Sequence, residues 1–181
     1  LNTIPKKTWS FWDKKDSYWN DFTVKSWDNI FFKGKNEIIE KNLTSMNYKM
    51  IKSESFYNHI YDKVKRQPNI KLKKGIVIDI EDLNDSVIVK SKTQTFIGDK
   101  VLNSIPDESY KNNLKFPVLL QHFVGWTIKT NKPAFDDDTA TLMDFSIDQK
   151  NETRFFYVLP TSKNEALVEF TLFSKHLLSN S

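Results

Sequence analysis

The sequence has no cysteine, only four glycines and no long apolar run among its 181 residues. Without cysteine the chain can form neither disulfide bonds nor metal sites with thiolate ligands. The glycines (Gly34, Gly75, Gly98 and Gly125) are too far apart for a G-x-G-x-x-G turn or a P-loop. These residues therefore offer no Rossmann-type cradle for dinucleotide phosphates. No window reaches the ~18 apolar residues of a membrane-spanning helix, so none is predicted.

Charge and histidine content exclude two further classes of partner. The chain carries 27 basic and 23 acidic side chains, for a net charge of +4. Its lysines are scattered, whereas nucleic-acid-binding proteins usually gather basic residues on one face, so we expect no nucleic-acid partner. The three histidines lack the spacing of a metal site, and we expect no metal. The 14 phenylalanines and five tryptophans fit either an ordinary aromatic core or the lining of a large apolar cavity.

The first two thirds of the sequence predict a helix followed by short strands. In residues 54–66, Phe56, Ile60 and Val64 recur at helical spacing and form one apolar stripe. Before this helix, the aromatic-rich residues 2–32 indicate loops and short strands, and residues 37–41 a short strand or turn. After it, β-branched residues and turn signals predict a β-meander with strands at 70–72, 76–81, 86–91, 93–97 and 100–105.

The last third predicts an all-β module. Strand patterns cover residues 119–130, 139–145, 153–159 and 165–173, and residues 106–117 are expected to form the loop that leads into them. The whole pattern is typical of an α/β (α+β) protein with two parts. Residues 1–118 would hold the helix and the meander, and residues 119–181 an antiparallel sheet.

Two carboxylates lie inside apolar strand patterns. Alternation along the last strand places Leu167, Glu169 and Thr171 on one face. Glu169 is then either a solvated residue on an outer face, the more common case, or an acid in an apolar pocket. Burial would raise the pKa of such an acid and let it donate a proton at neutral pH. Asp144 is similarly either a turn cap at a strand end or a second acid that orients Glu169.

Several segments together resemble the flavin-dependent lycopene β-cyclases of carotenoid synthesis. The matching runs are Gln-His-Phe-Val-Gly-Trp at 121–126, Leu-Met-Asp-Phe at 142–145, Arg-Phe-Phe-Tyr-Val-Leu-Pro at 154–160 and Ala-Leu-Val-Glu-Phe-Thr-Leu-Phe-Ser at 166–174. Lys-Thr-Trp-Ser-Phe-Trp at 7–12, Tyr-Lys-Met-Ile at 48–51 and Ser-Phe-Tyr at 55–57 also match, in the family's order. The resemblance implies a Rossmann-type FAD domain with an inserted antiparallel substrate sheet, similar to the flavin hydroxylases.

The resemblance also implies an activity. Members of the family fold the ends of lycopene, a C40 polyene, into β-ionone rings without net redox change. Reduced FAD would be the cofactor, NAD(P)H would only reduce the flavin, and the enzyme would be cytoplasmic and peripheral to the membrane surface.

Residue roles follow from the same resemblance. Glu169 is similar to the first glutamate of the plant motif Phe-Leu-Glu-Glu-Thr, the favoured acid/base, and Phe170 replaces the second. The resemblance also implies backbone contact with the adenine at Val77 or at its strand neighbours Ile76 and Ile78. We further expect a catalytic role for Asp144 and a substrate pocket formed by Phe123, Trp126, Phe145 and Phe156.

The resemblance covers the centre of the family's enzymes. Their glycine-rich turn is expected before Leu1 and their last flavin segment after Ser181. Residues 1–118 would then be a partial FAD-binding domain and residues 119–181 a partial substrate domain, and we expect the 181 residues alone to be inactive. Two alternatives stay open: a polyene- or lipid-binding module without catalysis, and an FAD-dependent hydroxylase relative.

Overall fold

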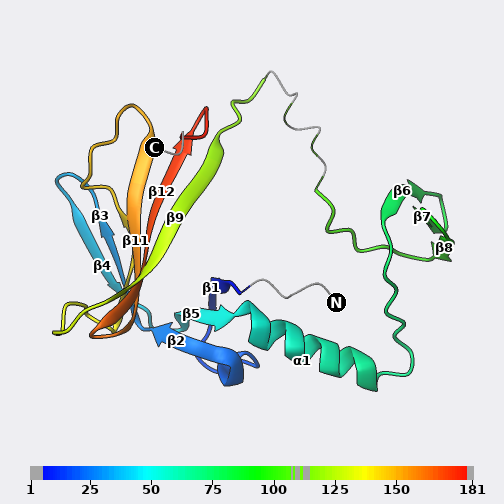
Figure 1. The fold of residues 1–181 in the computed structure, drawn as a ribbon, viewed down its shortest axis with the longest axis horizontal. Coiled ribbons are helices and arrows are strands. Elements are labelled where there is room, and N and C mark those ends of the chain that lie inside the picture. The colour runs from blue at the N-terminus through cyan, green and yellow to red at the C-terminus, as the bar shows by residue number, and fades with distance from the viewer. Residues whose placement is uncertain (1–5, 107, 109–110, 112–114, 179–181) are drawn as a thin grey trace. The chain divides into compact units, whose positions relative to one another are not determined.

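The computed structural model describes residues 6–106, 108, 111 and 115–178, and it is a mixed α+β fold rich in strands (Figure 1). It divides into two compact units. One consists of residues 1–60 and 117–181, and the other of residues 61–116. One unit boundary lies between residues 116 and 117, and the first 60 residues belong with the last part of the chain. The reason is a shared sheet.

That large sheet has six strands in the order β4 (Ile38–Asn42), β3 (Asn29–Lys33), β10 (Thr139–Asp144), β11 (Thr153–Ser162), β12 (Glu165–Ser174) and β9 (Leu120–Lys129). The four strands predicted after residue 119 are present and pair antiparallel with one another. The sheet is not purely antiparallel as expected, however, because β3 pairs with β10 in parallel. Without β3, the backbone groups along that edge of β10 would lack partners.

A second, smaller antiparallel sheet has β5 (Met46–Lys52) between β1 (Thr8–Lys14) and β2 (Thr23–Trp27). A 3₁₀-helix, η1 (Asn20–Phe22), leads into β2. The sequence analysis identified no strand at β5. Residues 47–51 are all buried, so they show no alternation of exposed and buried positions from which a strand could be predicted.

The core of this unit lies between the small and the large sheet. Trp27, Tyr48 and Met50 from the small sheet pack with buried residues of the large one, among them Leu159 and Ala140. Trp27 is fully buried, and its Nε1–H donates to the Pro160 carbonyl at 2.9 Å. Because an unpaired buried indole N–H is costly, this bond fixes the end of β2 against β11.

Helix α1 (Ser53–Arg66) confirms the predicted helix and begins one residue earlier. Its Phe56 and Tyr57 rings meet Trp9 of β1 edge-on, with centroids 5.4 and 5.6 Å apart. The predicted apolar stripe therefore covers β1 with aromatic contacts.

The second unit contains the predicted meander, formed by β6 (Val77–Asp82), β7 (Val87–Ser91) and β8 (Thr95–Gly98). The strands predicted at 70–72 and 100–105 are wrong. Within the described residues neither segment has a partner strand, and Leu72 and Leu102 are exposed. An apolar run without a partner leaves its backbone groups to water and turns. The predicted loop at 106–117 lies partly outside the described residues.

A buried ammonium group holds the loop that joins β1 to η1. Lys49 of β5 is only 2% exposed. Its Nζ donates to Asn20 Oδ1 at 2.6 Å and to the Lys14 carbonyl, and it lies 3.3 Å from Asp13 Oδ2. Since a buried charge is tolerated only when it is paired and hydrogen-bonded, these contacts tie the loop to β5.

We expect Lys49→Met to lower the free energy of unfolding by about 3 kcal/mol, because it removes the donor from several partly buried acceptors. The matched control is Lys129→Met. Lys129 pairs with Glu165 at 2.9 Å but its side chain is 75% exposed, so little or no loss is expected. Urea unfolding measures both, and equal losses would contradict the structural role of Lys49.

Candidate functional site

Glu169 lies in the middle of β12, between Tyr157 of β11 and Gly125 of β9, both directly opposite it. Residues opposite one another in neighbouring strands project from the same sheet face. Leu167 and Thr171 share this face by alternation; Leu167 packs on the core and Thr171 is 4% exposed. Glu169 therefore lies on the inner face, and the interpretation as a solvated outer-face residue is wrong.

Gly125 makes room for this side chain. A Cβ atom at position 125 would lie 2.9 Å from Glu169 Cγ and 3.2 Å from Oε1. The Glu169 side chain therefore extends across β9, over the backbone of Gly125.

A pair of tyrosines from the two sheets lies on the other side of Glu169. The hydroxyls of Tyr48, from β5, and Tyr157, from β11, are hydrogen-bonded to each other. The hydroxyl of Ser10, from β1, lies close enough to lower the pKa of both tyrosines through hydrogen bonding. Strands from both sheets thus contribute hydroxyl groups beside one carboxyl.

Burial favours the neutral form of all three ionisable groups. It raises the pKa of Glu169, and no residue in the described part of the chain donates a hydrogen bond to that carboxyl. Burial also raises the pKa of Tyr48 and, more strongly, that of Tyr157, and the nearby Glu169 charge adds to both shifts. The direction of this shift is the one expected for an acid in an apolar pocket. A half-buried, protonated carboxyl can act as a general acid.

Asp144 is not part of this arrangement. It pairs with Phe156, which pairs with Phe170, and this row alternates with the row of Tyr157 and Glu169. Asp144 therefore lies on the opposite face of the sheet, and the expected pairing with Glu169 is wrong. Its Oδ1 accepts a hydrogen bond from the Ser146 N–H at 2.9 Å, so the turn-cap interpretation is confirmed.

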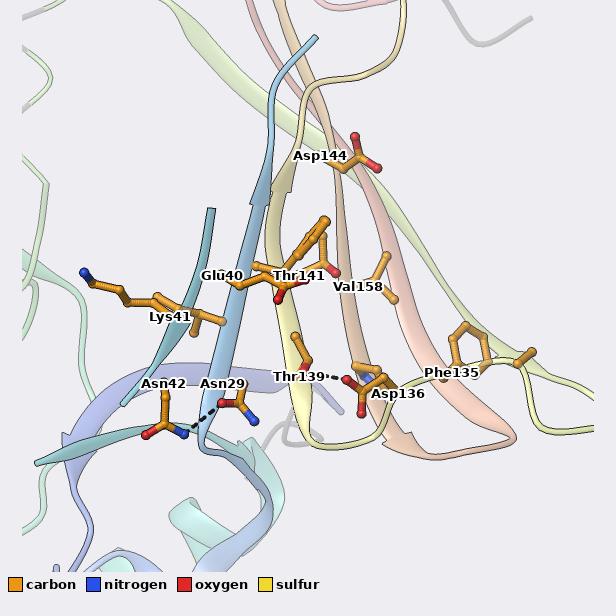
Figure 2. Close-up of a pocket in the computed structure, with 14 residues that line it drawn as sticks. Asn29, Glu40, Lys41, Asn42, Phe135, Asp136, Thr139, Thr141, Asp144 and Val158 are labelled. Atoms are coloured by element: carbon orange, nitrogen blue, oxygen red, sulfur yellow. Dashed lines mark hydrogen bonds between the residues drawn. The ribbon is translucent and has the colours of Figure 1, made fainter. Parts of the chain in front are cut away.

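A cavity of roughly 690 Å³ includes Asp144 on that opposite face. Figure 2 shows Asp144 at one end of it, with Glu40, Lys41 and Asp136 among the other lining residues. Hydrogen bonds between Asn42 and Asn29 and between Thr139 and Asp136 occupy its wall. Because a hydrocarbon gains nothing from such polar groups, this cavity is a poor candidate for an apolar substrate.

A second cavity, of roughly 550 Å³, adjoins the Glu169 face. Leu167 and Thr127, the next residues on that face from Glu169 and Gly125, line it together with Val24 and Met50. Lys6, Lys7 and Lys52 also contribute to the lining. Glu54 and Glu165 line it too, so only Val24, Met50 and Leu167 give it apolar surface, and Leu167 connects it to the face of Glu169.

The four aromatic residues predicted to form one pocket are divided between the two faces. Phe123 is opposite Thr171 and so lies on the Glu169 face. Phe145 packs edge-on against Phe155, which is also opposite Thr171, with centroids 5.4 Å apart. Trp126, opposite Val168, and Phe156, which packs on Phe170, lie on the other face. A single pocket of all four is therefore wrong.

Sequence reasoning missed the tyrosine pair and the role of Gly125. Tyr157 could have been found, because alternation places it with Phe155 and Leu159 on the inner face of its strand. Tyr48 could not, since it is 109 residues away from its partner and its strand shows no alternation.

The residues present do not form a site for the phosphates of a dinucleotide. The sequence has no glycine-rich turn, and the start of α1 is already engaged. The Ser53 N–H donates to the Lys7 carbonyl, and Ser53 Oγ accepts from the Lys7 N–H. Val77 is the first residue of β6, pairs with Ser91, and is 37% exposed; its contact with adenine stays a prediction.

None of the helices among the described residues has the length and apolar character needed to cross a membrane. The described residues also contain no cluster of three or more potential metal ligands.

The profile of the family described as "Lycopene cyclase protein" matches residues 2–180. No curated protein matches the chain significantly.

Solved structures match more weakly. They include 2,6-dihydroxypyridine-3-hydroxylase from Arthrobacter nicotinovorans (10% identity, TM-score 0.46, covering 90% of this chain and 43% of that one). The tetracycline destructases Tet(55) and Tet(51) match with 12% and 13% identity and a TM-score of 0.41 each, over 86% and 88% of this chain and 40% and 42% of theirs. The chain therefore spans about two fifths of the length of the solved structures that it matches.

The raised pKa of Glu169 predicts a pH-dependent stability difference. The folded chain retains the Glu169 proton at a pH where the unfolded chain, with a pKa near the ordinary 4.5, has lost it. Folding is therefore disfavoured increasingly as the pH rises from about 4 through the raised pKa. Glu169→Gln removes this loss, so its unfolding free energy relative to the wild type should increase between about pH 4 and pH 7. Urea unfolding at both pH values measures the difference, and a constant difference would show a well-hydrated carboxyl.

Proposed function

We propose, from the premise that the chain belongs to the lycopene cyclase family, that it is part of an enzyme that cyclises the ends of lycopene to β-ionone rings. The observation that carries this proposal is the half-buried Glu169 carboxyl on the inner face of the large sheet. Its pKa is raised by burial, and its neighbours on that face, Leu167 and Tyr157, pack against the core. Protonation of a hydrocarbon double bond needs such an acid in a water-poor site.

The chemistry assigned to Glu169 is a balanced proton transfer. The protonated carboxyl donates its proton to the terminal double bond, the resulting cation closes the ring by forming a carbon–carbon bond, and a ring carbon then loses a proton. The Glu169 carboxylate is the base that we assign to the last step, so no proton is gained or lost overall.

The cofactor belongs to the same proposal. Reduced FAD, which would stabilise positive charge, and NAD(P)H as its reductant are expected from the family resemblance. Because the residues present do not form a phosphate site, the flavin phosphates would be held by other parts of the enzyme, and the steps assigned to Glu169 do not pass through the flavin. Val77 is the proposed contact with the adenine through its backbone, within a Rossmann-type domain.

Contact with the substrate is proposed on the inner face of the large sheet. Phe123 and the cavity beside Leu167 supply apolar surface there. Lycopene is stored in lipid, so we also propose that the enzyme works at the periphery of a membrane.

We expect Glu169→Gln to slow ring formation by about 100-fold or more, because the amide cannot donate a proton to carbon. Binding of lycopene should be retained, since Gln has nearly the same shape. The measurement is product formation from lycopene by chromatography in the full-length enzyme, with lycopene binding followed by its absorbance. Asp144→Asn is the matched carboxylate variant, and its rate should stay close to wild type because Asp144 lies on the other face.

Other outcomes would identify the alternatives. Undiminished cyclisation by Glu169→Gln would reject the acid assignment. Lycopene binding without any ring formation by the wild-type enzyme would indicate a binding module. Consumption of NAD(P)H and oxygen in proportion to product would indicate a hydroxylase.

A further inference from the structure

A side chain at position 125 of the edge strand β9 would collide with Glu169. The 2.9 Å separation from a Cβ to Glu169 Cγ is well below the ~3.5–4.0 Å of carbon–carbon contact. The obstructing atoms belong to the middle of the Glu169 side chain and to its carboxyl. With any larger residue at 125, the carboxyl would have to leave its place over β9.

The neighbour on the opposite side, Tyr157, is already engaged. Its hydroxyl is hydrogen-bonded to that of Tyr48, with Ser10 close to both. In the part of the chain that the structure describes, the Glu169 carboxyl accepts no hydrogen bond from either tyrosine. Its position over Gly125 keeps it apart from these donors.

The charged groups near this face include Lys6, Lys7, Lys52 and Glu54, which line the neighbouring cavity beside Leu167. Tyr48 of β5 and Tyr157 of β11 are the neighbours whose pKa values respond to its charge. On β12 itself Glu165 shares the face, and its charge is paired with Lys129 at 2.9 Å. The inner face of β9 next to Gly125 carries only the uncharged Phe123 and Thr127.

We propose that Gly125 is a positioning residue for the acid: its missing side chain provides the space in which the Glu169 carboxyl lies across β9, without a hydrogen bond from Tyr157. This inference rests on the proposed function. Gly125 acts through Glu169 and needs no contact with the substrate.

A methyl group at position 125 would turn the Glu169 side chain either towards β11, where Tyr157 can donate a hydrogen bond, or outwards into water. Both environments stabilise the carboxylate relative to the carboxylic acid. A smaller fraction of the enzyme would then carry the protonated acid at neutral pH. Because the acid must be protonated to act, activity would be lost at a lower pH than in the wild type.

The first test is the kinetics of Gly125→Ala in the full-length enzyme with lycopene. We expect kcat to fall about tenfold or more, with KM nearly unchanged and the high-pH limb of the kcat profile displaced to lower pH. The matched control is Gly98→Ala, because a Cβ there meets only the Lys100 carbonyl, at 3.8 Å. A wild-type kcat and pH profile for Gly125→Ala would overturn the proposal.

A double-mutant cycle of unfolding free energies tests the same steric contact between position 125 and Glu169 without measuring activity. Gly125→Ala should destabilise the wild-type protein but be neutral or stabilising in a Glu169→Ala background, where the obstructing Cγ is gone. Equal effects in the two backgrounds would overturn the proposal.

The two hypotheses fail in different ways. If Glu169→Gln leaves cyclisation intact, the acid assignment fails, while the double-mutant cycle still reports on the space over Gly125. If Glu169→Gln abolishes cyclisation but Gly125→Ala does not change kcat, only the role of Gly125 is rejected.

Discussion

The rest of the site depends on how the small sheet is held against the large one, and the buried hydrogen bond from Trp27 to the Pro160 carbonyl is central to this contact. Trp27 ends β2 and Pro160 lies in β11, so the bond joins one sheet to the other. The same contact brings Tyr48 of β5 to Tyr157 of β11 and excludes water from the inner face near Glu169. Loss of this packing would expose the carboxyl and return its pKa towards that of a hydrated glutamate.

Burial desolvates the Glu169 carboxyl, and no hydrogen bond from the described residues offsets this, so its pKa is raised. Carboxylates in ion pairs or with several donors have lowered pKa values and are poor acids at neutral pH. Asp13, which accepts hydrogen bonds from Ser17 and Lys49, illustrates that opposite case, because its pKa is lowered. Glu169 lies instead over Gly125 and beside hydroxyls that bond to each other. In the described residues, the partly exposed Asp13 of the small sheet thus has several donors, whereas Glu169 of the large sheet has none.

The predictions succeeded where local pattern and tertiary contact agree. The helix at 54–66 formed because its apolar stripe meets Trp9, and β9–β12 formed at the predicted places because their alternation matches a sheet with one face on the core. They failed where the structure of a segment depends on whether a distant strand pairs with it. Residues 70–72 and 100–105 contain apolar positions but lack a partner strand in the described chain, whereas β5 is a strand without alternation because both of its faces are covered.

By itself the sequence determined the strand pattern of the last third, the strand face on which Glu169 lies, and the resemblance to a family whose profile matches residues 2–180. Alternation has a period of two, so the face shared by Glu169 and Leu167 follows from their spacing alone. Only the tertiary structure decided which face is covered, because that depends on the small sheet. It also decided that Asp144 lies on the opposite face and that Tyr48 meets Tyr157. Strand register and contacts between distant segments are set by the packing of whole sheets, which no local spacing encodes.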